Sequence, residues 1–173
     1  MIKSPQKSLI NEMKIYNEGK WIEKIVRTLY HVYVKAPFYK LYIGMLEKVF
    51  YEKYDRLVGL NVSLIRVLYR ILGMEDNLIL SSDLGVKLAR DDKLNEICVK
   101  LEATVYLANN GSKPYINQSK FQKKNIGFVF QDYEHPVYDA RLYNFHKYLS
   151  VLDPIFWHGP KSLEIILKGR NNN

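Results

Sequence analysis

The sequence predicts an α/β fold in which a helical N-terminal half leads into a small, mainly parallel sheet flanked by helices. Two observations predict it. In the first half, apolar residues recur with the helical period, whereas the second half alternates short β-branched and aromatic runs with helix-like stretches. A chain of 173 residues fits one domain. We expect its helical part to cover about 18–73 and its α/β part about 77–168.

Three helices are predicted in the first half. The first covers about 21–35 and is limited by Pro37, because the residue before a proline avoids the α region. The second covers about 39–51. The third begins near Asn61, a favourable N-cap residue, and stops at Gly73, since glycine commonly follows the last helical residue.

Strands and helices alternate in the second half. Three apolar runs are predicted to be strands: 77–81, 104–108 and 127–131. They alternate with helices over about 91–101 and 116–123, which is the pattern of parallel β-α-β units. The near-continuous apolarity of the runs favours strands that are covered on both faces. A short helical segment near Leu149 follows, and Pro160 is well placed as the first residue of a last helix.

A polar cluster follows each predicted strand. The candidate substrate-binding residues in these clusters are Ser81, Ser82, Asp83, Asn110, Gly111, Ser112, Lys113 and Gln131. Ligands bind beyond the carboxyl ends of the strands in open parallel sheets, so we expect the clusters to share one edge. Two alternatives stay open: residues 81–83 can simply turn the chain, and residues 109–113 can form an ordinary turn rather than a phosphate cradle.

Asp132 and His135 are the candidate catalytic residues. A carboxylate near an imidazole can orient it and raise its basicity, as a general base requires. Residues three apart need not touch, however, and Pro136 makes this segment extended or turned. Tyr138 is a candidate substrate-binding residue, with a core position as the alternative. For His158, capping the last helix is favoured over lining a pocket.

Composition excludes several classes. The net charge of +8 is spread along the chain apart from one cluster near 120–124, so it does not indicate nucleic-acid binding. No run is long enough to span a membrane, and no signal peptide is present, so a cytoplasmic location is expected. The single cysteine, Cys98, predicts a buried thiol. No residue spacing matches a metal site, and no metal or cofactor is expected.

Three segments near the C-terminal end carry a family resemblance. They are FQDYEHPVY (130–138), YLSVLDPIF (148–156) and HGPKSLEII (158–166). In this order they resemble the signature of the WbqC-like family of bacterial surface-polysaccharide clusters, and segments at 35–38 and 81–84 fit the same family upstream. Members usually open with a Met-Gln-Pro segment that this sequence does not show, so we expect an N-terminally truncated member. Residues 109–112 are also bulkier than the family's small loop.

The resemblance implies a role in the synthesis of O-antigen or another surface glycan. It implies a transferase that places an acyl or aminoacyl group on a nucleotide-linked amino sugar, with His135 as base and Asp132 as its orienting partner. The alternative is a non-catalytic binding or scaffold protein. Loss of an N-terminal strand region would expose a sheet edge, which favours self-association into a homo-oligomer.

Overall fold

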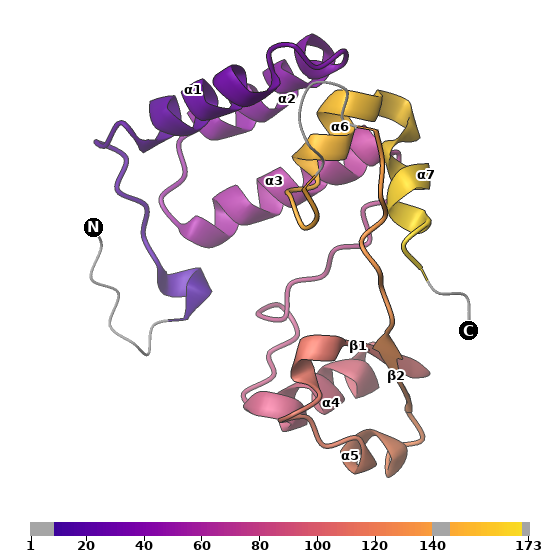
Figure 1. Cartoon of the computed structure of the whole chain (residues 1–173). Helices are drawn as coiled ribbons and strands as arrows, with labels where there is room; N and C mark the ends of the chain where they lie inside the picture. The colour runs from indigo at the N-terminus through magenta and orange to yellow at the C-terminus, as the bar shows by residue number, and fades with distance from the viewer. Residues whose placement is uncertain (1–8, 140–145, 171–173) are drawn as a thin grey trace. The chain divides into compact units, whose positions relative to one another are not determined.

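The computed structural model describes residues 9–139 and 146–170 (Figure 1). Its contacts divide the chain into two compact units. Unit 1 consists of Met1–Asp76 and His135–Gly169, and unit 2 consists of Asn77–Glu134 with Arg170–Asn173. The chain therefore leaves the first unit for the second and returns to the first at His135.

Unit 1 is helical. Its elements are η1 (Ile10–Glu12), α1 (Trp21–Tyr33), α2 (Tyr39–Tyr51), α3 (Leu57–Leu72), α6 (Leu152–His158), η3 (Gly159–Lys161) and α7 (Ser162–Leu167). The three predicted helices of the first half are confirmed, and Gly73 ends α3 in the left-handed conformation with φ +67°. Pro160 lies in the 3-10 turn before α7 rather than at the first position of the α-helix.

The predicted start of the third helix was wrong. The helix begins at Leu57, and Asn61 is an exposed residue inside it. The cause is a tertiary contact: the amide of Leu57 donates to the carbonyl oxygen of Met13 at 2.9 Å, and the amide of Ile15 donates to that of Asp55 at 3.0 Å. This short pairing fixes the chain in front of the helix, and no N-cap side chain is used there.

Aromatic rings form the core of unit 1. The ring of Phe156 is fully buried and lies 5.0 Å from that of Tyr33 and 5.2 Å from that of Tyr39, measured between ring centres. The amide of Phe38 donates to the carbonyl oxygen of Phe156 at 3.0 Å, which ties the start of α2 to α6. Every residue from Asp153 to Trp157 is buried, so α6 is a central element of this unit.

Unit 2 is a small α/β layer. Its elements are α4 (Arg90–Lys100), β1 (Val105–Asn109), η2 (Asn110–Ser112), α5 (Ser119–Gln122) and β2 (Gly127–Gln131). The two strands are parallel, with Val105 opposite Gly127 and Asn109 opposite Gln131. The predicted α/β fold with a parallel sheet is thus confirmed.

One predicted strand is absent from unit 2. Residues 77–81 form no strand, and Ile79 is 55% exposed. The run is apolar enough for a strand, but apolarity alone does not supply a hydrogen-bonding neighbour. The two strands that do form pack one face on the core around Phe121, whereas Leu107 and Val129 on the other face are more than half exposed, at 59% and 51%. Only one face is therefore covered within this unit.

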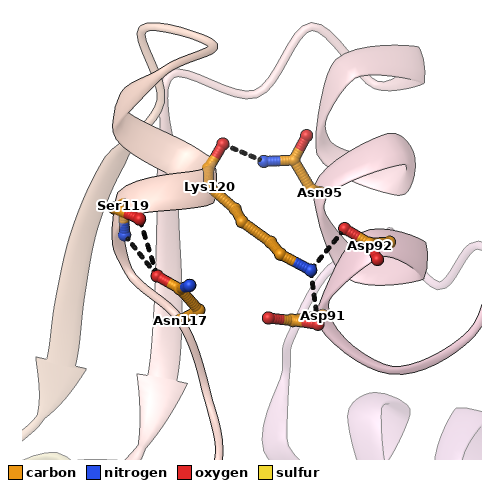
Figure 2. A network of polar contacts seen from close by, with 6 residues as sticks. All are labelled: Asp91, Asp92, Asn95, Asn117, Ser119 and Lys120. Atoms are coloured by element: carbon orange, nitrogen blue, oxygen red, sulfur yellow. Dashed lines mark hydrogen bonds and ion pairs between the residues drawn. The ribbon is translucent and has the colours of Figure 1, made fainter.

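A polar network joins α4 to α5 (Figure 2). The buried Asn95 donates its side-chain amide to the carbonyl oxygen of Lys120 at 2.8 Å. The ammonium group of Lys120 in turn forms ion pairs with the carboxylates of Asp91 at 3.2 Å and Asp92 at 2.7 Å, both on α4. Because one residue of α5 is held through both its backbone and its side chain, the short helix is fixed on the first turn of α4.

Candidate functional site

Two of the three predicted polar clusters meet at the carboxyl edge of the sheet in unit 2. The pairing of Asn109 with Gln131 places the ends of β1 and β2 side by side. Residues 110–113 continue directly from β1, and the ammonium group of Lys113 lies 5.1 Å from the ring centre of Phe130 in β2. This is a cation–π distance, so the loop after one strand contacts the other strand.

The loop after β1 is a compact turn. The hydroxyl of the buried Ser112 donates to the carbonyl oxygen of Asn109 at 2.7 Å and closes a 3-10 turn. Asn110, Gly111 and Lys113 are exposed. The observed geometry is that of the ordinary turn, with exposed polar groups available on its outer side.

The first cluster does not join this edge through the sheet, since no strand precedes it. Residues 81–85 form a turn, in which the amide of Asp83 donates to the carbonyl oxygen of Leu80 at 3.0 Å. The hydroxyl of Ser82 donates to the Asp83 carboxylate at 3.2 Å, and Ser81 is exposed beside them. Of the two interpretations for this cluster, the structure shows the turn.

A second polar cluster lies inside unit 1. The hydroxyl of Tyr138 donates to Oδ2 of Asp153 at 2.8 Å, and both residues are buried. The rings of His135 and His158 lie 6.1 Å and 5.4 Å from the ring of Tyr138, measured between centres. Burial, and then the charge of Asp153 and a hydrogen bond with it, raise the pKa of Tyr33. One buried carboxylate thus organises two tyrosines beside two histidines.

His135 carries a defined tautomer. Its Nδ1 lies 3.0 Å from the carbonyl oxygen of Pro136. A carbonyl oxygen only accepts hydrogen bonds, so Nδ1 carries the proton and Nε2 is the basic nitrogen. The residue predicted to orient this ring, Asp132, falls in unit 2, whereas His135 falls in unit 1. The role of Asp132 stays a prediction, and the observed orienting group is a backbone carbonyl.

His158 lines a cavity of about 580 Å³ in unit 1, with Phe38, Asp139, Trp157 and Lys161 among the other lining residues. Its Nε2 is buried and has no hydrogen-bond partner among the described residues. Its side chain makes no capping hydrogen bond to the following helix, so the favoured interpretation of His158 as a cap was wrong. Most of the residues that line the cavity have ring side chains, and the remaining two are Asp139 and Lys161.

Asp153 and its contacts were missed at the level of sequence. The only signal was a lone aspartate at the start of an apolar run, LDPIFW, where a charge needs a partner if it is buried. Two tyrosines far apart in the sequence supply that partner. Tyr148 is 81% exposed and lies 5.4 Å from His135 between ring centres.

Among residues 9–139 and 146–170, no group of three or more histidine, cysteine or acidic side chains is placed to hold a metal ion. Within the same ranges, no helix has the length and apolarity that crossing a membrane requires.

Comparison with known proteins gave one match. A family model described as the WbqC-like protein family matches residues 1–165. Neither the curated proteins nor the solved structures contain a match to the chain.

Proposed function

The chain belongs to the WbqC-like protein family, and we propose that it transfers an acyl or aminoacyl group to a nucleotide-linked amino sugar during the synthesis of O-antigen or a related surface glycan. The family match supports the setting of surface-polysaccharide synthesis. The tautomer of His135 supports the chemistry, because an amine acceptor must lose a proton before or as it attacks.

His135 acts as the general base in this proposal. Its Nδ1 donates to the carbonyl oxygen of Pro136, and we assign Nε2 to take the proton of the sugar ammonium group. The ring of Tyr138, which donates a hydrogen bond to Asp153, lies 6.1 Å from the imidazole between ring centres. A base that is already oriented before the substrate binds lowers the entropic cost of reaching the transition state for proton transfer.

The transfer step balances with an activated acyl donor whose acyl carbon bears an oxygen or sulfur leaving group. The deprotonated amine attacks the acyl carbon, an N–C bond forms, and the bond from that carbon to the leaving group breaks. The imidazolium of His135 then returns its proton to the leaving group, and the second proton of the attacking nitrogen passes to solvent. An ammonium group and an acyl donor thus give an amide, the protonated leaving group and one proton. Within unit 2, the exposed polar groups of 110–113 and Gln131 stay candidates for binding phosphate or hydroxyl groups, as do Ser82 and Asp83.

The test is turnover by the His135→Ala variant, with UDP- and dTDP-linked amino sugars as acceptors and thioesters as donors, and with the acylated sugar detected by mass spectrometry. Turnover should fall by about 100-fold or more, since general-base catalysis contributes roughly that factor. The matched control is His146→Ala, which removes an exposed histidine. Asp132→Asn tests the predicted orienting partner in the same assay.

Unchanged turnover in His135→Ala would refute the assignment of the base. Binding of an amino sugar by the wild-type chain without turnover of any acceptor and donor pair would instead support the non-catalytic alternative.

A further inference from the structure

A second cavity, of about 640 Å³, lies in unit 2. It is lined by residues from the first turn of α4 and from β1 and the segment after it, namely Arg90, Asp91, Leu94, Tyr106, Asn109, Ser112, Tyr115 and Ile116. Its volume is in the range that encloses a small organic ligand. It also lies beside the carboxyl end of a parallel strand, where open α/β sheets bind ligands.

Two phenol rings line this cavity. Tyr115 is 75% exposed, so most of its ring is available to a ligand. Tyr106 is partly buried and stacks on Phe121 with ring centres 4.9 Å apart and an interplanar angle of 22°. Burial raises the pKa of Tyr106, and the neighbouring Cys98 and Tyr115 raise it further, so Tyr106 is neutral near pH 7. Neutral aromatic faces favour a planar ring as ligand.

Arg90 supplies positive charge to the same cavity. The acidic neighbours Asp91 and Asp92 are engaged by Lys120, which holds the pKa of Asp91 below its ordinary value (Figure 2). Arg90 forms no ion pair within the part of the chain that the structure describes. A guanidinium group that is not paired with a carboxylate can bind a phosphate group through two parallel N–H···O hydrogen bonds, in bidentate geometry.

The backbone at Arg90 is unfavourable for its residue type. Its φ is +54°, in the left-handed region that favours glycine. A glycine would fit this conformation better but would remove the guanidinium. Strain of this kind concentrates at functional positions, and here it accompanies a cationic side chain that lines a cavity.

We propose that this cavity binds a nucleoside diphosphate, with its base stacked on Tyr115, its phosphate groups on Arg90, and its ribose or base edge on the amide of Asn109. The proposal rests on the proposed function, and the cavity that it concerns is lined by residues of unit 2 alone. Ser112 contributes as an acceptor, because its own proton is donated to the Asn109 carbonyl oxygen.

The test is calorimetric titration of the full chain with UDP and dTDP, without a sugar attached. The wild-type chain should show saturable binding, and Tyr115→Ala should weaken it by about tenfold or more, the effect of losing one stacked base. Tyr115→Phe keeps the ring and should restore binding. Tyr148→Ala, which removes a tyrosine that is 81% exposed in unit 1, should leave it unchanged.

Arg90→Gly is the matched charge variant, since glycine accepts the observed φ and the fold should be kept. It should weaken diphosphate binding by about tenfold, whereas removal of the exposed Lys87 as Lys87→Ala should not. Absence of binding by the wild-type chain, or an affinity equal to the wild-type value in either Arg90→Gly or Tyr115→Ala, would overturn the site.

The two proposals fail separately. Turnover of an amino sugar with unchanged KM in the Arg90 and Tyr115 variants would overturn the nucleotide site and leave the proposed function standing. Nucleotide binding that depends on both residues supports the site even where the wild-type chain transfers no acyl group, which would count against the proposed function alone.

Discussion

Gly159 follows the candidate residue His158, and its replacement by alanine should destabilise unit 1 strongly. Its φ is +55° and its ψ is −123°, a combination that L residues rarely adopt. A Cβ atom built on it would lie 2.6 Å from Cγ of Phe38. That is far inside van der Waals contact, so the Phe38 ring must move. The Phe38 backbone is tied to α6 by the hydrogen bond from its amide to the carbonyl oxygen of Phe156 at 3.0 Å.

The magnitude follows from two costs. An unfavourable backbone conformation costs on the order of 1–3 kcal/mol, and overpacking a filled interior costs typically about 1–3 kcal/mol. The Gly159→Ala variant should therefore lose roughly 2–6 kcal/mol of unfolding free energy. A domain has only about 5–15 kcal/mol in total, so the variant will be close to unfolding.

Urea unfolding measures this loss, with Gly73→Ala as the control. Gly73 also has positive φ, at +67°, but a Cβ there meets nothing within 4 Å. The control should lose only about 1–2 kcal/mol. In a Phe38→Ala background the steric cost of Gly159→Ala should largely disappear, as a double-mutant cycle would show. Equal losses at the two glycines, or the same loss with and without the Phe38 ring, would refute the reasoning.

Three further predictions concern ionisable groups. Burial raises the pKa of the Cys98 thiol, so the native chain should react slowly with a thiol reagent and quickly in urea; rapid native labelling would contradict its burial. Burial, with Asp153, raises the pKa of Tyr33 above its ordinary 10.0, so the folded chain keeps this proton while the unfolded chain loses it. The stability contribution is complete below about pH 10 and lost as pH rises further, and Tyr33→Phe should flatten that decline, whereas an unchanged slope counts against it. Lys120→Met should raise the pKa of the Asp91 carboxyl toward its ordinary value in an NMR titration. An unchanged pKa would show that Lys120 is not what lowers it.

Local patterns predicted the elements that depend on local forces. The helix over Tyr39–Tyr51 was predicted with its observed bounds, because its apolar positions recur regularly and Pro37 lies just before it. The start of α3 was missed because it depends on pairing with Met13, more than 40 residues away. The strand predicted at 77–81 is absent for a related reason: an apolar run becomes a strand only where a neighbouring strand pairs with it, and the sequence of the run does not show whether one does.

The candidate site shows the same division. The carboxyl edge with Asn109 and Gln131 followed from two correctly predicted parallel strands. The hydrogen bond from Tyr138 to Asp153 could not be predicted, because it joins residues that are 15 apart in the sequence and meet only in the folded chain. The tautomer of His135 depends on the carbonyl of the next residue, whose direction is fixed only in the folded chain.

The central proposal requires this chain to bind a nucleotide-linked amino sugar, and a thermal melt of the full chain with such sugars tests that binding most directly. At about a hundred times its dissociation constant, a bound ligand adds roughly 2.7 kcal/mol. For a chain of this size that is a rise in Tm of about 5–11 °C. We predict such a rise with a UDP- or dTDP-linked amino sugar, and a smaller one with the matching sugar that carries a hydroxyl in place of the amine. A cooperative melt that no member of the panel shifts would contradict the claim.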